Sequence, residues 1–481
     1  ILPHDIKRLY LLKYFVMAAG ACVSGYILSL FLNKIFSANI MLYIGSAPKS
    51  IVQLIIPFLA TGLIFFIVLF FCMLTLRRFN RITAVEALRL GNTGESYTRN
   101  SFLPLYKNRF FNVNIFIGLR DVLLRFKLYT LLFFVFLICT FIIIVPINFL
   151  NTTQSPEFVT YMGMGHSEIL IDLRYTENIV ERFENMVTYI EQDPDVEKFS
   201  TLIICKFNII NKDGYEESLI VGTGDSTVFP LEYLEGTAPV GDNEIALSYL
   251  IAQELEKSVG ENIQLVVDDQ IKMMQVSGIY QDITNGGKTA KADIAPNHET
   301  ALWYMVNLDV KTNTDEKIDE YSEAFYPAKV TDIDGYVDQT FENTTSQLKL
   351  MALLAVIIAI LVAMLITSLF LKMLIAKDSS QIVIMKCLGL SLKDIRLQYI
   401  TRALVVLNTG IILGTVFSNT IGQSMISAIL SMLGAPKMDF IINPYHAYIL
   451  CPIVLIIIVT ITTLLSIVSI KNLNMSDMNA E

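Results

Sequence analysis

Six long runs of apolar residues dominate the hydrophobic pattern of this chain. A helix of about 20 residues crosses the ~30 Å hydrocarbon core of a bilayer, and each run reaches that length. No charged residue interrupts the chain between Ile51 and Leu76 or between Leu128 and Leu150. The alternative, a soluble protein with six all-apolar buried helices, is disfavoured by their number and length. The predicted spans cover approximately residues 11–36, 51–76, 128–150, 348–375, 401–431 and 446–470.

The segment between the third and fourth runs has a different pattern, with short alternating stretches separated by turn residues. Alternation of apolar and polar residues predicts half-buried strands, and apolar residues three and four apart predict helices. We expect strands over residues 167–173, 199–210, 218–221, 262–267 and 272–280, and helices over residues 176–191 and 245–255. The fold class is therefore a polytopic α-helical membrane protein of about six transmembrane helices with one α+β domain.

The charges are divided between this domain and the rest of the chain. Residues 151–345 hold 36 of the 45 acidic side chains but only 12 of the 36 lysines and arginines, a net charge of −24, whereas the remainder has a net charge of +15. Short loops rich in Lys and Arg stay in the cytoplasm, while a large acidic domain can be translocated. We therefore predict that residues 151–345 are extracytoplasmic. The overall charge of −9 averages two faces, and we expect no nucleic-acid partner.

The two longest basic connections are predicted to be cytoplasmic. Residues 77–127 carry ten lysines and arginines against three acidic residues, and residues 377–400 include Lys377, Lys386, Lys393 and Arg396. The short connections 37–50 and 432–445 then lie outside. Six crossings with both termini inside satisfy this assignment.

Two stretches of the chain superimpose at an offset of 389 residues. Both stretches run from a predicted cytoplasmic helix into a span. At a second offset, of 393, residues 82–87 align with residues 475–480. The matched pairs bracket two spans joined by a short outer loop, so we predict the latter part of one repeat followed by a whole repeat. The pairs at offset 389 are Asp5 to Lys7 with Asp394 to Arg396, Tyr10 with Tyr399, Lys13 with Arg402, and Gly25 with Gly414.

The segment Ser379–Arg402, with the sequence SSQIVIMKCLGLSLKDIRLQYITR, carries the clearest functional signal. Its apolar strip is followed by a turn and by a helix that Ser391 caps, with Asp394 in the capping-box position. A short helix across the cytoplasmic ends of two spans could pass force from a soluble subunit into the membrane. An interfacial helix resting on anionic lipid fits the spacing equally well.

The sequence IVIMKCLGLSLKDIRLQYITRALVVLNTGIILG resembles the permease signature of the FtsX/MacB family, the membrane subunits of type VII ABC transporters. NRITAVEAL at residues 80–88 is similar to the end of that family's last span. EGTAPVGDNEIALSYLIAQELEKSVGENIQL at residues 235–265 resembles the core of its periplasmic domain. Two departures stand out. Arg402 and Lys13 occupy places where the family often has Glu, and the first repeat lacks its leading part. We therefore expect an N-terminally incomplete permease, either a fragment of a longer chain or one whose first half is a separate chain.

The resemblance implies a bacterial plasma-membrane protein made of several successive domains. Residues 1–90 would be the latter part of a first permease repeat, 91–127 a basic linker and elbow helix, 128–150 a span, 151–347 the MacB-like outer domain, and 348–481 the second repeat. The ATPase-coupling residues would be Ile382, Met385, Leu388, Gly389, Leu390, Ser391 and Asp394. The family's pattern includes a span with spaced glycines, so the resemblance also implies close helix packing at Gly25, Gly410 and Gly414.

The resemblance also implies partners and a function. The partners would be a cytoplasmic ABC ATPase dimer, membrane lipid, and an extracytoplasmic peptide, lipoprotein or cell-wall component. The chain would couple ATP hydrolysis on the partner to outer movement, for export or release of a peptide, lipoprotein or antibiotic. The alternative is a non-transport sensor or cell-wall regulatory subunit. We expect no cofactor and no catalysis in the chain itself, since its four histidines are scattered and residues 285–289 match only the tail of a P-loop.

Two further expectations concern polar residues. The six cysteines have neither disulfide nor zinc spacing, so we predict that they are structural. An ion-coupled carrier would need acidic residues at the membrane midplane, and we predict none. We expect the cations Lys349, Lys372 and Arg402 near the ends of spans to extend their charges toward the interface.

Overall fold

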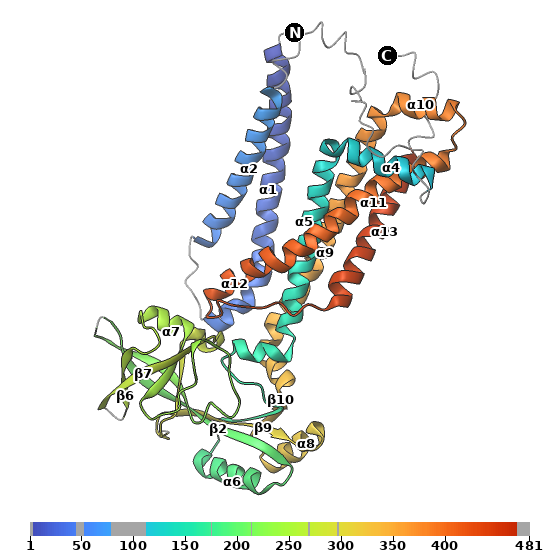
Figure 1. The fold of residues 1–481 in the computed structure, drawn as a ribbon. Helices are drawn as coiled ribbons and strands as arrows, with labels where there is room; N and C mark the ends of the chain where they lie inside the picture. The colour runs from blue at the N-terminus through green and yellow to red at the C-terminus, as the bar shows by residue number, and fades with distance from the viewer. Residues whose placement is uncertain are drawn as a thin grey trace. The chain divides into compact units, whose positions relative to one another are not determined.

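The computed structural model consists of two compact units, residues 1–107 and 108–481. It describes residues 3–44, 52–77, 112–174, 176–212, 214–267, 270–295 and 298–468. In the first unit, α1 (Pro3–Ile44) and α2 (Val52–Arg77) pack along each other as a helical hairpin (Figure 1). Edge-to-face ring contacts of Phe15 with Phe65 and of Tyr26 with Phe58 join the two helices.

The second unit has a helical bundle and an outer domain. Within the bundle, α11 and α9 both pack against α5, and α13 packs against α9 and α11. A continuous cluster of buried apolar side chains fills the space between these helices, while their outer faces expose large apolar residues, as suits contact with lipid. The helices are α4 (Val113–Leu124), α5 (Phe126–Thr153), α9 (Ile333–Lys377), α10 (Ser379–Cys387), α11 (Leu392–Phe417), η5 (Ser418–Gly422), α12 (Gln423–Ser431), η6 (Tyr445–Leu450) and α13 (Cys451–Ile467).

The prediction of six spans is confirmed. Six helices of the described residues are long and apolar enough to cross a membrane, within the bounds Arg8–Phe31, Pro57–Leu74, Phe126–Thr153, Ile333–Lys377, Leu392–Ser431 and Tyr445–Ile467. The fourth is much longer than the predicted span 348–375, because the polar residues before it continue the same helix outside the bilayer. The predicted division into permease repeats stays a prediction, and its boundary at residue 90, like residues 80–88 and 475–480, lies outside the described residues.

The outer domain is built on one mixed sheet with the strand order β10-β1-β9-β2-β3-β8-β5-β7-β4, and β6 pairs with both β2 and β7. The predicted α+β class is thus confirmed. The strands are β1 (Ile169–Leu173), β2 (Val196–Ile210), β3 (Glu216–Thr223), β4 (Tyr233–Gly236), β5 (Glu244–Ser248), β6 (Asn262–Val267), β7 (Gln270–Tyr280), β8 (Thr289–Ala292), β9 (Ala301–Val310) and β10 (Lys329–Asp332). The other helices are η3 (Pro156–Tyr161), α6 (Ile179–Gln192), α7 (Tyr249–Glu254), η4 (Thr284–Gly287) and α8 (Thr314–Ala324).

The core of this domain explains its sequence pattern. The amphipathic α6 places Phe183, Met186 and Ile190 in the main apolar cluster against the sheet. One predicted element is wrong: residues 245–255 do not form a single helix. Their first half is β5, which pairs in parallel with β7, and only the second half is helical. The last four residues of β5 are buried, which suits a central strand, and its last residue, Ser248, is the N-cap of α7.

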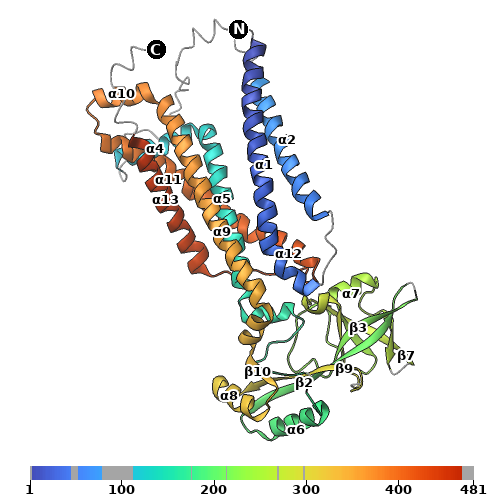
Figure 2. The same cartoon turned by 180° about the vertical axis from the view of Figure 1, so that it is seen from behind.

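The outer domain and the bundle are covalently joined through long helices. α9 follows β10 directly and runs without a break to the residue before α10 (Figure 2). Its start is capped by Asp332, whose carboxylate accepts a hydrogen bond from the backbone N–H of Gly335 over 2.9 Å. α9 is therefore one helix of 45 residues with one end on the outer sheet and the other at α10.

Candidate functional site

The segment between α9 and α11 forms a short helix followed by a sharp turn. α10 ends before Gly389, whose φ of +89° favours glycine. The backbone N–H of Leu390 then donates to the carbonyl of Met385 over 3.1 Å. The predicted capping box is confirmed, because the Ser391 hydroxyl accepts from the Asp394 N–H and the Asp394 carboxylate accepts from the Ser391 N–H. The local sequence therefore fixes α10, the turn and the start of α11.

The structure divides the predicted apolar strip between two faces of α10. Ile382 is fully buried in the cluster of the bundle, and Met385 packs against that cluster. Leu388 is 75% exposed and Ile384, one turn before it, is 53% exposed. Residues four apart lie on the same helix face, so Ile384 and Leu388 form an outward apolar pair. Ile384 is not among the residues predicted to contact the ATPase, and Ile382 anchors the helix instead of facing outward.

The start of α11 is also tied to α4. The Asn114 side-chain amide donates to the Asp394 carboxylate over 2.8 Å, and the Gln398 side-chain amide donates to the Asn114 carbonyl oxygen over 3.1 Å. Asn114 lies in the first turn of α4, which Asn112 caps. Asp394 thus caps α11 and holds a helix that is far away in the sequence.

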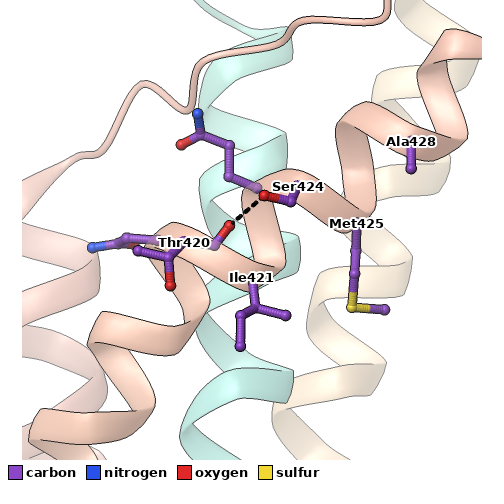
Figure 3. A pocket seen from close by; sticks show the side chains of 7 residues that line it. Thr420, Ile421, Ser424, Met425 and Ala428 are labelled. Atoms are coloured by element: carbon purple, nitrogen blue, oxygen red, sulfur yellow. Dashed lines mark hydrogen bonds between the residues drawn. The ribbon is translucent and has the colours of Figure 1, made fainter.

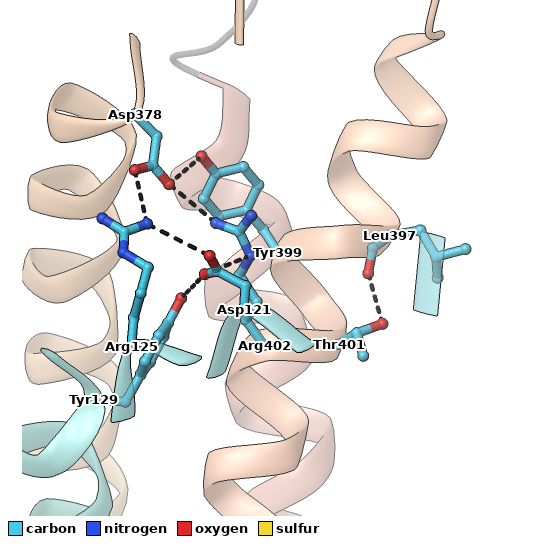
Figure 4. Close-up of polar contacts among 8 residues, drawn as sticks. All are labelled: Asp121, Arg125, Tyr129, Asp378, Leu397, Tyr399, Thr401 and Arg402. Atoms are coloured by element: carbon cyan, nitrogen blue, oxygen red, sulfur yellow. Dashed lines mark hydrogen bonds and ion pairs between the residues drawn. The ribbon is translucent and has the colours of Figure 1, made fainter. Parts of the chain in front are cut away.

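A buried cluster of two acidic and two basic side chains lies where α4, the end of α9 and α11 meet (Figure 4). Arg402 donates to one oxygen of Asp378 over 3.0 Å, and Arg125 donates to the other over 3.1 Å. Arg402 Nε also lies 3.3 Å from Asp121 Oδ2, while Arg125 lies 3.5 Å from Asp121 Oδ1. None of the four side chains is more than 12% exposed. We call these four residues the charge cluster; its formal charges cancel.

Two tyrosines complete the charge cluster. The Tyr399 hydroxyl donates to Asp378 over 3.2 Å, and the Tyr129 hydroxyl donates to Asp121 over 2.7 Å. The Arg402 guanidinium also lies 4.5 Å from the centre of the Tyr399 ring. Buried charges persist when they are paired and hydrogen-bonded, and removing one partner is strongly destabilising. The cluster therefore joins α4, the end of α9 and α11 into one body.

The prediction for Arg402 is wrong. Its side chain does not extend toward the interface but is 5% exposed inside the charge cluster. The acidic partners, Asp121 and Asp378, come from two other segments of the chain, and spacing along α11 gives no sign of them.

The bundle also has a close helix contact. A Cβ added at Gly410 would lie 2.8 Å from Phe136 Cβ, and one at Gly414 would lie 2.7 Å from Thr140 Cβ. These glycines let α11 approach α5 closely, as small residues do in membrane helix contacts. At Gly25 an added Cβ would meet no atom within 4 Å in the described part of the chain, so Gly25 does not share this geometry.

At the opposite end of the bundle, the loop between α12 and η6 docks onto the outer domain. The Lys437 N–H donates to the side chain of Gln281 over 2.8 Å, and the Asp439 N–H donates to the Tyr161 hydroxyl over 3.1 Å. The Asp282 N–H donates to the carbonyl of Gly434 over 3.3 Å. We call residues 432–443 together with Gln281, Asp282 and Tyr161 the outer junction.

A shallow surface hollow lies beside η5 and α12 (Figure 3). Its lining includes both polar and apolar side chains, and the hydroxyl of Ser424 donates to the carbonyl of Thr420 over 3.0 Å. Asn419 in the same lining accepts from Asn148 over 2.9 Å and donates to Tyr448 over 3.0 Å. These bonds tie α5, η5 and η6 together. Within the part of the chain that the structure describes, no group of three or more His, Cys, Asp or Glu residues could hold a metal ion.

The comparisons with known proteins agree with these features. Residues 353–475 match the family model described as FtsX-like permease C-terminal. No curated protein matches the chain.

Among solved structures, part of this chain is similar to three domains. The periplasmic region of MacB from Actinobacillus actinomycetemcomitans has 10% identity and a TM-score of 0.27, covering 38% of this chain and 95% of that one. A permease protein domain from Porphyromonas gingivalis has 12% identity and a TM-score of 0.25, covering 35% and 90%. The extracellular domain of the noncanonic ABC-type transporter YknZ from Gram-positive bacteria has 10% identity and a TM-score of 0.26, covering 34% and 100%. The family match includes α10, α11 and α13. The chain is therefore a multi-pass membrane protein with an extracytoplasmic domain between its third and fourth spans, and its residues 353–475 are similar to the C-terminal domain of FtsX-like permeases.

Proposed function

We propose that this chain is the permease subunit of an ABC transporter and that it converts ATP hydrolysis by a cytoplasmic ATPase dimer into movement of the outer domain. The observation that carries the proposal is the pair of exposed apolar side chains, Ile384 and Leu388, on a helix whose opposite face is buried. An exposed apolar pair on a short helix suits insertion into a groove of a soluble partner. Ile382 on the buried face would pass the resulting force into the bundle.

The contacts around α10 supply a route for that force. The charge cluster joins the end of α9 to α4 and α11, so a displacement of α10 would move all three together. α9 rises about 1.5 Å per residue and is therefore about 67 Å long. Its far end is capped by Asp332 on the outer sheet, so α9 would act as a stiff lever between α10 and the outer domain.

The outer junction would be a second connection. It ties the loop after α12 to Gln281, Asp282 and Tyr161, so α11 and α12 would act on the outer domain together with α9. Such a machine would act on substrate outside the membrane. We propose export or release of a peptide, lipoprotein or antibiotic as its work. A sensor or cell-wall regulatory subunit, the alternative, would need no ATPase on α10.

The test is co-purification of an ATPase with the tagged full-length chain, detected by labelling with a photoreactive ATP analogue. We expect the wild type to retain a labelled ATPase and Leu388→Asp to lose most of it, because a charge would enter the apolar groove. Leu302→Asp is the matched control, since Leu302 is an exposed leucine of the outer domain. A wild type without ATPase, or a Leu388→Asp variant that retains as much as Leu302→Asp, would overturn the proposal.

A further inference from the structure

A small polar cavity lies in the outer domain, on the face of the sheet opposite the main core. Its volume of about 20 Å³, measured as the space open to the centre of a water molecule, leaves room for one small polar group. Strand alternation explains the lining: Ala290 and Ala292 of β8 belong to the main core, so Lys291 between them faces the other way. Ser200 and Asn307 are paired residues of β2 and β9 and bring two more polar side chains to the same place.

The polar groups of this cavity are mainly hydrogen-bond donors. No hydrogen bond or ion pair to the Lys291 ammonium is formed among the described residues; its nearest aromatic contact is the Tyr280 ring at 5.5 Å. Ser226 is 8% exposed, and its buried hydroxyl has no partner in the described structure. Asn307 is 4% exposed and uses its carbonyl oxygen to accept from Ser167 over 3.5 Å. The amide nitrogen of Asn307 is thus left for another acceptor.

The acidic residue at this cavity does not satisfy these donors. Asp225 is exposed at the rim, and its Oδ1 accepts from the N–H and the hydroxyl of Thr227 over 2.7 and 2.6 Å. Burial lowers the pKa of the Lys291 ammonium, and the Asp282 carboxylate opposes that shift. A half-buried cation beside unpaired buried donors is costly until an anionic acceptor satisfies it.

We propose that this cavity binds one carboxylate group of an extracytoplasmic ligand, held by the Lys291 ammonium, the Asn307 amide and the Ser226 hydroxyl. Charge-assisted hydrogen bonds from an ammonium to a carboxylate are about twice as strong as neutral ones, so Lys291 would dominate the affinity. The volume excludes the rest of the ligand, which would extend past the Asp225 rim. The ligand is therefore a molecule with an accessible terminal carboxylate, such as the end of a peptide.

The cavity lies next to the side chains that form the outer junction, so ligand binding could affect that junction. Met164 and Leu202 both line the cavity. Leu202 belongs to the apolar cluster that contains Tyr161 of the outer junction, and Met164 packs against that cluster. A ligand here would reach the outer junction through adjacent packed side chains. This consequence rests on the proposed function, whereas binding itself does not.

The binding test uses the full-length chain without ATPase, so its outcome is independent of the transport proposal. Trp303 is the only tryptophan of the sequence and packs against the same apolar cluster, so its fluorescence reports on this region. Sodium acetate is titrated against sodium chloride at constant ionic strength, and neutral acetamide has the same shape as acetate. We expect a saturable fluorescence change with acetate and none with acetamide.

Two variants and one control locate the binding. Lys291→Met should weaken acetate binding at least about tenfold, as loss of a charged hydrogen bond does. Ser226→Ala should weaken it by a few-fold while keeping the fold. Lys288→Met removes the same charge from a partly exposed lysine paired with Glu254 and should bind acetate like the wild type. Equal responses to acetate and acetamide, no saturable response, or unchanged binding in both Lys291→Met and Ser226→Ala would overturn the proposal.

Discussion

Arg402 of α11 donates a hydrogen bond over 3.0 Å to Asp378, which is 24 positions earlier and lies between α9 and α10. Their side chains are 6% and 3% exposed. In the interior such a pair costs desolvation, but once formed it resists separation of the parts that it joins. Asp378 is also the C-terminal cap of α9, so this bond links the end of α9 directly to α11. Asp378 therefore joins the segment between α9 and α10 to α11 through a buried ion pair.

Asp378→Asn should strongly destabilise the protein. After the substitution, only Asp121 remains to balance the charges of Arg402 and Arg125 within the charge cluster. Loss of one partner of a buried ion pair costs about 3–5 kcal/mol of folding free energy. Asp309→Asn is the control, since Asp309 pairs with the partly exposed Lys198 and such surface pairs contribute about 0–1 kcal/mol. Thermal unfolding of the full-length chain in detergent measures both. Equal melting temperatures for the two variants would mean that the charge cluster does not hold the bundle together.

Gly414→Ala should weaken the contact between α11 and α5. The added methyl would lie 2.7 Å from Thr140 Cβ and 2.9 Å from the Leu137 carbonyl oxygen, and overpacking of this kind costs about 1–3 kcal/mol. Gly25→Ala meets open space in the described residues and should be neutral or slightly stabilising. The melting temperatures of the two variants provide the comparison, and a Gly414→Ala variant as stable as Gly25→Ala would contradict close packing at this position.

Gly434→Ala should loosen the outer junction. Gly434 has a φ of +109°, and an added Cβ would lie 2.1 Å from the Asp282 carbonyl oxygen. Gly214→Ala is matched in backbone strain, because Gly214 has a φ of +83° but open space around it. Hydrogen–deuterium exchange over residues 432–443 should therefore rise in Gly434→Ala and stay at the wild-type level in Gly214→Ala. Equal exchange in both variants would show that the close approach has no role.

The stability of the outer domain should depend on Asp282 between about pH 4 and pH 6. Burial raises the pKa of this carboxyl from 3.8 to about 6, against hydrogen bonds from Thr284 and Thr289 that lower it. The folded state therefore holds the proton more tightly than the unfolded state, so stability is greater at low pH and falls as the pH rises through this window, by on the order of 2–3 kcal/mol. Asp282→Asn should flatten this dependence in exchange measurements over β7 and β8. If the wild type and Asp282→Asn showed the same pH dependence of stability, this prediction would be contradicted.

The apolar runs were sufficient to predict the spans, and the charge pattern was sufficient to predict the outer domain. Both features can be read from neighbouring residues in the sequence without knowing which helices pack together. The capping box at Ser391 and Asp394 was also predictable, since its two residues are three positions apart. The orientation of α10 was not: Ile382 to Met385 are all apolar, so no periodicity tells which of them faces the bundle. Ile382 is buried because it packs into the apolar cluster of the bundle, which forms only in the folded chain.

The charge cluster could not be found from spacing at all. Asp121, Asp378 and Arg402 meet only after α4, α9 and α11 have packed, so the sequence shows three separate charges near the ends of helices. The length of α9 was underestimated for a related reason. Its first turns are polar and lie outside the bilayer, and an apolar run marks only the part inside lipid.

The most direct test of the account is hydrogen–deuterium exchange at the outer junction in the chain reconstituted with its co-purifying ATPase. Residues 432–443 are compared without nucleotide and with ATP plus vanadate, which traps the ATPase. We predict that trapping changes exchange at this loop in the wild type and in Leu302→Asp but not in Leu388→Asp. Exchange that is the same in both nucleotide states of the wild type, while the ATPase is bound, would contradict a mechanical link from α10 to the outer domain.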